Sequence, residues 1–382
     1  MAACEGGRSL PPPVTLFLCG DVMLGRGLDQ ILPNPSEPTL HESYMRNAVE
    51  YVALAERASG GIARPVAFPY VWGDALAELE QRRPAVRIIN LETSITRSDR
   101  PWPKGIHYRM HPDNVPCIAA AGVDCCVLAN NHVIDWGREG LVETLGTLRR
   151  ARIEVAGAGA DLASARAPAI LPLAGEARVL VFAAATDDSG VPESWAAGAD
   201  RSGVHRLPDL SATTVAQIAA EVQRHRRSHD VVVFSLHWGG NWGYEISPEQ
   251  RAFARGLIDS AGVDVVYGHS SHHAKAIEVY RERLILYGCG DFLNDYEGIS
   301  GHDEFRDDLG LMYFPMIDAA TGQLRELNLV PTRVRQLRIN RAEGADRRWL
   351  LATLRRECGS FGCEVTDGSD GAFSVRWRPS AA

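Results

Sequence analysis

The stretch CCVLANNHVIDWG, residues 125–137, places a short apolar run directly before a dense group of hydrogen-bonding side chains. The run CCVLA has the length and composition of a buried strand. Asn130, Asn131 and His132 follow it at once, and Asp135 comes three residues later. Because loops at strand ends are held in place by a rigid scaffold, polar groups gathered there indicate a functional site.

Five further segments share this arrangement. Each is a run of β-branched and aliphatic residues of strand length, with its polar residues at the carboxyl end. Continuous rather than alternating apolar character predicts strands that are covered on both faces, as in α/β sheets. The segments are VTLFLCGD (14–21), VRIINLE (86–92), VVVFSLHWGG (231–240), VDVVYGHSSHH (263–273) and LILYGCGD (284–291).

Helical patterns separate several of these strands, which predicts an α/β fold. The clearest is SPEQRAFARGLIDSAG, where Ser247 is a cap residue, Pro248 opens the helix and Gly262 ends it. DALAELEQRR and GLVETLGTLRRARI have similar patterns. We expect one main domain over residues 14–335. An appendage over residues 336–382 would follow, made of the helix RRWLLATLRREC and the strand AFSVRW.

Length and composition indicate a globular protein and argue against a nucleic-acid-binding or membrane-spanning one. A chain of 382 residues with 45% hydrophobic content can bury a full core, and a net charge of −8 argues against nucleic-acid binding. No run approaches the roughly 20 apolar residues of a membrane span, and the N-terminus lacks the pattern of a signal peptide. The eight cysteines show no C-x-x-C spacing, which favours reduced thiols. We therefore predict a cytoplasmic protein without a membrane anchor; the sequence carries no signal of its oligomeric state.

The strand ends supply the ligands of a divalent metal. In open α/β sheets, ligands bind outside the carboxyl ends of strands. Carboxylates, amides and imidazoles without thiolates suit Mn, Fe, Zn or Mg better than a structural zinc site. Any one of these residues alone is commonly a turn residue. Their recurrence at six strand ends favours a metal site. The residues gathered there are Asp21, Asn90, Glu92, Asn130, Asn131, His132, His237, His269, His272 and Asp291.

The order of these residues resembles the calcineurin-like metallophosphoesterase pattern. More narrowly, six ordered blocks resemble the CapA family, which is named for capsule and poly-γ-glutamate synthesis. The resemblance implies a four-layer α-β-β-α sandwich with one or two ions, of Mn, Fe or Zn, at the carboxyl ends of the strands. The blocks are GDVMLGR, NLETSIT, ANNHVIDWG, HWGGNWGYE, GHSSHH and LILYGCGDF.

The resemblance also assigns roles to single residues. Asp21 matches the first carboxylate, and Glu92 matches the ligand that bridges both ions. His132 matches a histidine that acts as general acid or stabilises the transition state without binding metal. Asp135 is predicted to orient His132, because catalytic imidazoles are commonly held by a carboxylate. The implied metal ligands are Asp21, Glu92, Asn131, His237, His269 and His272.

The sequence departs from the phosphoesterase pattern in three places. Met23 stands where the pattern D-x-H has its histidine, and Glu92 replaces an aspartate. The last histidine pair is spaced H-x-x-H, one residue wider than usual. These departures predict one ion position with a full set of ligands and one position that has fewer ligands and binds its ion more weakly.

A cluster of cations in this acidic chain suggests an anionic substrate. The segment KGIHYRMHP contains Lys104 and Arg109, and Arg26 could join them. Arginine binds carboxylate or phosphate groups in a bidentate manner, so these side chains and Asn130 are candidate substrate ligands. The alternative is an ordinary solvated loop.

Two functions remain open from the sequence. The first is a metal-dependent hydrolase in which a metal-activated water attacks a phosphoester or a γ-glutamyl-type amide of an anionic small molecule or polymer. The second is a non-catalytic accessory protein that binds a poly-anionic polymer or a partner enzyme. Retention of His132 favours the first, and Met23 favours the second.

Overall fold

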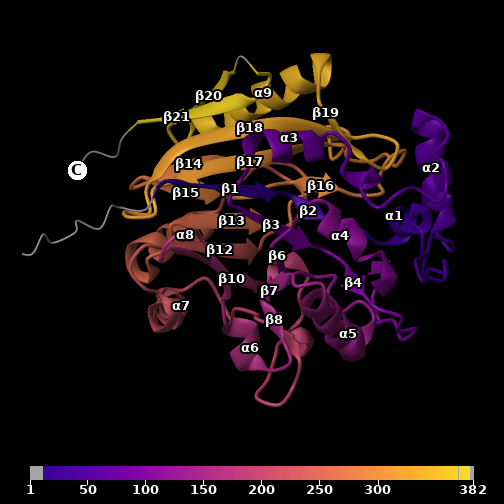
Figure 1. Cartoon of the computed structure of the whole chain (residues 1–382), viewed down its shortest axis with the longest axis horizontal. Helices are drawn as coiled ribbons and strands as arrows, with labels where there is room; N and C mark the ends of the chain where they lie inside the picture. Colours follow the sequence, from indigo (N-terminus) through magenta and orange to yellow (C-terminus); the bar gives the residue numbers. More distant parts are fainter. Residues whose placement is uncertain (1–11, 369, 379–382) are drawn as a thin grey trace, which may run out of the picture.

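The computed structural model describes residues 12–368 and 370–378, and its strands form two large sheets (Figure 1). The larger, eleven-stranded sheet has the main path β16 (Asp291–Leu293), β2 (Asp21–Val22), β3 (Val86–Leu91), β1 (Val14–Cys19), β17 (Leu309–Ile317), β18 (Leu324–Val334), β21 (Phe373–Trp377) and β20 (Cys363–Asp367). Off this path, β6 (Cys125–Val127) pairs with β3 and with β7 (Glu154–Ala156), and β19 (Ile339–Arg341) pairs with β18.

The smaller sheet has six strands in the order β14 (Ile277–Tyr280), β15 (Arg283–Leu286), β13 (Val265–His269), β12 (Asp230–His237), β10 (Arg178–Ala185) and β9 (Ala169–Pro172). Two short pairs lie outside both sheets, β4 (Ser94–Ile95) with β5 (Arg109–Met110) and β8 (Ala158–Gly159) with β11 (Gly203–Val204).

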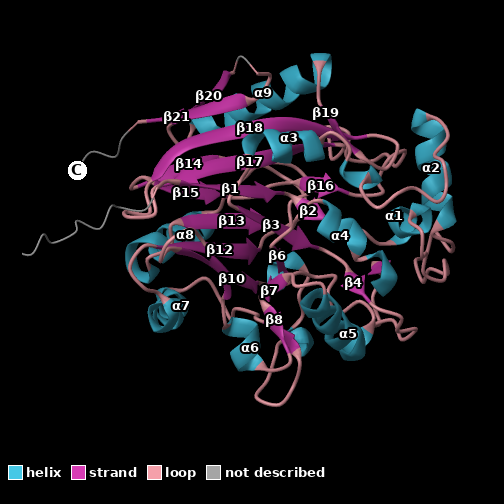
Figure 2. Ribbon diagram, in the orientation of Figure 1, coloured by secondary structure: helices cyan, strands magenta, loops and turns pink. Residues whose placement is uncertain are grey.

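Helices lie around the strands (Figure 2). They are α1 (Arg26–Ile31), α2 (Val49–Ser59), α3 (Ala75–Arg82), α4 (Pro116–Ala120), α5 (Gly137–Arg150), α6 (Leu162–Arg166), α7 (Ala212–His225), α8 (Pro248–Ala261) and α9 (Gly344–Gly359). The predicted mixed α/β class is therefore confirmed. The predicted start and end of α8 are also confirmed: Ser247 Oγ accepts a hydrogen bond from the Gln250 amide at 3.1 Å, and Gly262 ends the helix with a φ of 70°.

The six-stranded sheet is covered on both faces. On one face, alternate residues such as Phe182 and Phe234 pack with α7 and α8 in one hydrophobic core. On the other face, Val181 and Val233 share a second core with Leu16 and other residues of the larger sheet. This arrangement explains the continuous apolar runs of β10 and β12, because every position along such a strand faces a packed layer.

One predicted strand is divided between the two large sheets. The segment LILYGCGD was expected to be a single strand ending at Asp291, but β15 ends at Leu286 in the smaller sheet and β16 begins at Asp291 in the larger sheet. Gly290, at a φ of 77°, turns the chain between the sheets. A Cβ atom on Gly20 would lie 2.1 Å from the Gly290 carbonyl oxygen, so glycine at position 20 permits the close approach of β2.

Parallel pairing brings the carboxyl ends of the central strands together. β16, β2, β3 and β6 pair in parallel in the larger sheet, as do β10, β12 and β13 in the smaller sheet. The polar residues at these strand ends therefore meet where the two sheets face one another.

The predicted appendage, residues 336–382, is tied to the rest of the chain where it is described. β21 pairs with β18 and sets Phe373 opposite Leu329, and Leu350 and Leu354 of α9 share the main core. In Figure 1 these yellow elements lie beside β18. Burying one such side chain contributes about 1.5–3 kcal/mol, so this segment adds to the stability of the main core.

Two expectations concern chemistry rather than topology. All seven cysteines among the described residues are free and buried, in agreement with reduced thiols. Within residues 12–368 and 370–378, no helix combines the length and the apolar character needed to cross a membrane. The first eleven residues, which hold most of the N-terminal segment tested for a signal peptide, lie outside the described part of the chain.

Candidate metal centre

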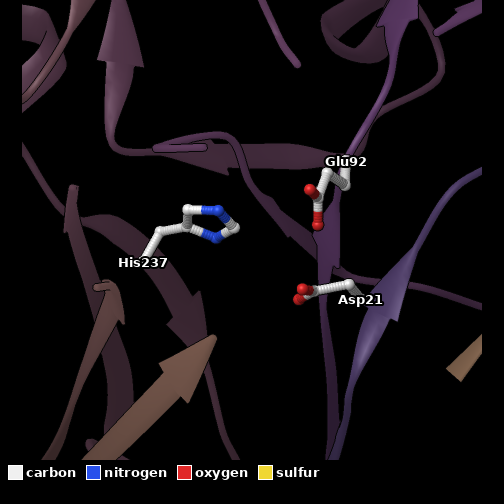
Figure 3. A group of neighbouring side chains, drawn as sticks. All are labelled: Asp21, Glu92 and His237. Atoms are coloured by element: carbon white, nitrogen blue, oxygen red, sulfur yellow. The ribbon is translucent and has the colours of Figure 1, made fainter. Parts of the chain in front are cut away.

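Asp21, Glu92 and His237 converge on one point between the two sheets (Figure 3). Asp21 begins β2, Glu92 follows β3, and His237 ends β12 of the other sheet. One ligand atom from each lies within 4.8 Å of the others, and all three residues are buried. Two carboxylates and an imidazole at this spacing can hold a divalent ion.

Four atoms of the predicted ligand residues lack any hydrogen-bond partner in the described structure. They are Glu92 Oε2, Asn131 Oδ1, His237 Nδ1 and His269 Nε2, and each is buried. A buried polar group without a partner costs about 1–3 kcal/mol, so buried polar groups are normally paired. A carboxylate, an amide oxygen and two imidazoles left unpaired together fit one divalent ion as their common partner.

Asp21 orients one of these imidazoles. Its Oδ1 accepts a hydrogen bond from Asn90 Nδ2 at 2.8 Å and lies 2.6 Å from His269 Nδ1. Because a carboxylate only accepts, the proton of His269 resides on Nδ1, and Nε2 keeps its lone pair for a ligand. Although burial opposes ionisation, the neighbouring His269 holds the pKa of Asp21 well below its usual range.

Burial shifts the pKa values of the other two residues of the centre, His237 and Glu92. It lowers the pKa of His237 to about 3, so the imidazole is neutral at pH 7, which is the metal-binding form. Burial and the nearby Asp21 carboxylate raise the pKa of Glu92 well above its usual value. A divalent ion would offset this repulsion between two buried carboxylates.

His132 lies beside this centre with a carboxylate partner. Its Nδ1 is 2.6 Å from Asp135 Oδ2, and its Nε2 is 3.9 Å from Glu92 Oε1. Lys104 Nζ donates to Asp135 Oδ1 at 2.7 Å and to the Asn131 carbonyl at 2.6 Å. The Tyr108 ring stacks on the imidazole with centroids 3.8 Å apart. These contacts hold the ring with Nδ1 protonated and Nε2 directed towards the metal-ligand cluster.

His272, the remaining predicted ligand, pairs with a different carboxylate. Its Nδ1 lies 3.0 and 3.1 Å from the two oxygens of Asp291. Burial alone would lower the pKa of His272, but Asp291 reverses the effect and raises it.

The predicted substrate ligands fall into two groups. Lys104 is at the site, in contact with Asp135. Asn130 also lies there, but its side chain braces the loop: Nδ2 donates to Asn90 Oδ1 at 2.9 Å, and Oδ1 accepts from the His132 amide at 3.1 Å. Arg109 donates instead to two backbone carbonyls, those of Ser98 and Glu37, and stacks on Trp136.

Arg26 is buried among other partners. Its guanidinium forms ion pairs with Glu42 and Asp295 and donates to the Tyr51 hydroxyl at 3.0 Å. Substrate contact by Arg26 or Arg109 would require these bonds to be exchanged, so the structure gives both residues a structural role, and their predicted substrate role is without support from these contacts.

Sequence reasoning grouped Asn90 and Asp291 with the strand-end candidates but gave neither an individual role, and it did not single out Tyr108. Asn90 and Asp291 end strands, and that position was the available signal for both. Tyr108 carried no such signal, because its stacking on His132 depends on how the loop before β5 folds back over the site.

Removing divalent ions with a chelator is expected to lower the melting temperature. The reason is that Asp21 and Glu92 would then face one another without a compensating charge. Adding Mn²⁺ at about 100 times its Kd should return about 2.7 kcal/mol of stability. Differential scanning calorimetry measures both changes, with His237→Ala as the variant that should not respond. Equal melting temperatures of the wild type in chelator and in Mn²⁺ would contradict the metal centre.

Comparison with known proteins identifies relatives along most of the chain. The family described as bacterial capsule synthesis protein PGA_cap matches residues 15–296. A Mycobacterium tuberculosis protein (strain H37Rv) named probable polyglutamine synthesis accessory protein is 49% identical over 370 residues, which cover 96% of each chain. The capsule biosynthesis protein CapA of Bacillus anthracis is 25% identical over 282 residues, covering 74% of this chain and 60% of its own.

Among solved structures, a phosphatase from Mycoplasma pneumoniae matches 84% of this chain and 93% of its own with a TM-score of 0.44 and 10% identity. The resemblance seen in the six sequence blocks is confirmed by the family match and by the near-full-length relative. The chain belongs to the family of bacterial capsule synthesis proteins.

Proposed function

We propose that this protein is a metal-dependent hydrolase with an anionic substrate, built on the four-layer α-β-β-α fold of the metallophosphoesterases. The observation that carries the proposal is the set of four unpaired, buried ligand atoms beside the pair of His132 and Asp135. The two packed faces of the six-stranded sheet support the layered fold.

The metal centre and the histidine divide the chemistry between them. A divalent ion held by Asp21, Glu92 and His237 would supply Lewis-acid activation of a water nucleophile and of a substrate oxygen. Burial, reinforced by the charge of Lys104, lowers the pKa of His132 to about 4 in spite of Asp135, so the ring is neutral at pH 7. Nε2 of the neutral ring accepts a proton during attack and returns it to the leaving group. Asp135 holds Nδ1 and stabilises the protonated ring between these steps.

The relatives' names direct the choice of substrate. The capsule-synthesis names point to a polymer that carries carboxylates or to its phosphorylated precursors, whereas a polyglutamine would carry neutral amides in place of the carboxylates. Ions bound at the centre would attract either class of anion. We therefore expect hydrolysis of a phosphoester or of a γ-glutamyl-type amide.

A substrate screen tests this proposal. The purified protein, supplied in turn with Mn²⁺, Fe²⁺ and Zn²⁺, is assayed with phosphomonoesters, phosphodiesters and γ-glutamyl peptides. We expect turnover of one class that is absent in His237→Ala, which lacks a ligand atom of the centre. A protein that holds metal and turns over none of these substrates would contradict the proposal.

A second candidate is an accessory protein that binds a poly-anion without cleaving it. One observation favours it: Met23 is buried and its Sδ accepts a hydrogen bond from the Gly25 amide at 3.2 Å, so this position supplies no imidazole to the centre. The word accessory in the relative's name agrees with it. Binding of poly-γ-glutamate that depends on metal and leaves the polymer length unchanged would support this candidate.

A further inference from the structure

A second cavity of ligand size lies in the C-terminal segment and shares no residue with the candidate metal centre. Its volume is about 570 Å³, within the range of about 300–1,000 Å³ that is usual for ligand sites. It lies among the end of α9, the edge strand β20 and the end of β21, which lie together at the top of Figure 1. None of the described residues that line it falls within 15–296, the range that the family model matches.

Arginines dominate the charge of this cavity, which we call the arginine groove. Arg355 of α9, together with Arg376 and Arg378 at the end of β21, lines it, and Glu364 of β20 is the one acidic residue among its described lining residues. The carbonyl end of α9 adds about half a negative charge. Three guanidinium groups outweigh this partial charge and one carboxylate, so the groove is positive in a chain whose net charge is −8.

Two of these arginines have no acidic partner in the part of the chain that the structure describes. Arg376 and Arg378 are exposed, and neither forms a hydrogen bond or an ion pair with residues 12–368 or 370–378. Arg347, which also belongs to α9, pairs by contrast with Asp367. The two guanidinium groups at the end of β21 are therefore available to an external anion.

The third arginine is held in a fixed position. Arg355 Nε donates to the Val365 carbonyl at 2.9 Å, which leaves the two terminal nitrogens of the guanidinium for another acceptor. Arginine binds a carboxylate through two parallel hydrogen bonds. Trp377 packs against the main core and also lines the groove, so it offers an apolar surface beside the cations. A ligand with carboxylates on short methylene arms matches both features.

We propose that the arginine groove binds a polycarboxylate chain of the poly-γ-glutamate type. The chemical class of this ligand rests on the proposed function, whereas binding in the groove needs no metal. A second attachment point raises the effective concentration of a long polymer at the protein. A short substrate that binds only at the metal centre should gain nothing from the groove.

A binding titration in the presence of a chelator tests the groove apart from the metal centre. The ligand is fluorescently labelled poly-γ-glutamate of defined length, and its control is the same polymer with the carboxylates converted to amides. We expect the acid form to bind, more weakly as salt rises because exposed charges are screened, and the amide form not to bind.

Loss of the unpaired arginines should weaken this binding. Arg376→Gln and Arg378→Gln, combined in one variant, should raise the Kd of the acid form about tenfold, because hydrogen bonds to charged groups are lost. Arg348→Gln is the matched control and should keep the wild-type Kd. Arg348 is exposed on the same helix as Arg355 but is not among the described residues that line the groove.

Gly359, the last residue of α9, offers a variant that leaves every arginine in place. A Cβ atom added there would meet no other atom within 4 Å, so a longer side chain can enter the groove without displacing its walls. Gly359→Glu should raise the Kd about tenfold by neutralising the arginines. Gly359→Gln has the same size without the charge and should bind nearly as the wild type does. Equal affinities of these two variants would contradict a site that depends on charge.

Two further results overturn the inference and leave the proposed function intact. One is an unchanged Kd in the double arginine variant, and the other is tighter binding of a single-stranded DNA of equal charge, which would assign the groove to nucleic acid. The opposite case is a protein whose groove binds the polymer but which, loaded with metal, hydrolyses no substrate of the screen. That result would support the groove and contradict the proposed function alone.

Discussion

Replacing His132 by alanine is expected to lower kcat by about 10²–10⁴-fold, the range typical of a positioned acid or base. Metal content should stay the same. Nδ1 of His132 is committed to Asp135, and Nε2 is 3.9 Å from Glu92 Oε1 and is not one of the four unpaired ligand atoms. Removing the ring therefore takes away a proton acceptor and leaves the ligand set complete. Turnover and elemental analysis of the same preparation test both parts of the prediction.

Asn131→Ala is the matched variant, one residue away on the same loop. Asn131 Oδ1 is unpaired and buried, so its loss should lower metal occupancy and activity together. If His132→Ala loses metal as completely as Asn131→Ala, His132 is a ligand and its role as acid or base is wrong. A small loss of stability with unchanged kinetics in both variants would instead make them ordinary turn residues.

The candidate metal centre was largely predictable because its residues share a position that sequence can reveal. Asp21, Glu92 and His237 each follow an apolar run of strand length, and parallel pairing brings such ends together. Pairings between residues far apart in sequence were not predictable in the same way. Asp291 meets His272 because the chain changes sheets at Gly290, and the segment LILYGCGD looked like one strand.

The roles of the cations show the same limit. A cluster of positive residues in an acidic chain suggests anion binding. The sequence does not reveal which acidic side chains or carbonyl groups those positive residues contact in the folded protein. Lys104 lies at the site, where it donates to Asp135. Arg109 donates to backbone carbonyls, and Arg26 forms ion pairs with two acidic residues. Composition cannot distinguish a guanidinium that faces a substrate from one that neutralises buried carboxylates, since both occur in the same sequence pattern.

The partners of Arg26 lie on separate parts of the chain. Glu42 belongs to the insert after α1, and Asp295 follows β16. The side chains of both acids are 0% exposed, and that of Arg26 is 2% exposed. Nη1 lies 2.9 Å from Glu42 Oε1, and Nε lies 3.2 Å from Asp295 Oδ2. The guanidinium also lies over the Tyr108 ring, 4.7 Å from its centroid, and that ring stacks on His132.

Arg26→Met is expected to lower the free energy of unfolding by about 3–5 kcal/mol, the usual cost of removing one partner of a buried ion pair. The methionine keeps most of the apolar stem but leaves Glu42 and Asp295 without a counter-charge. Arg325→Met is the control, because Arg325 pairs with Asp318 at the surface, where such pairs contribute at most about 1 kcal/mol. Urea denaturation of both variants measures the difference. If Arg26→Met instead keeps the stability of the wild type and raises KM, then Arg26 binds the anionic substrate as its sequence context suggested, and the buried ion pairs do not stabilise the fold.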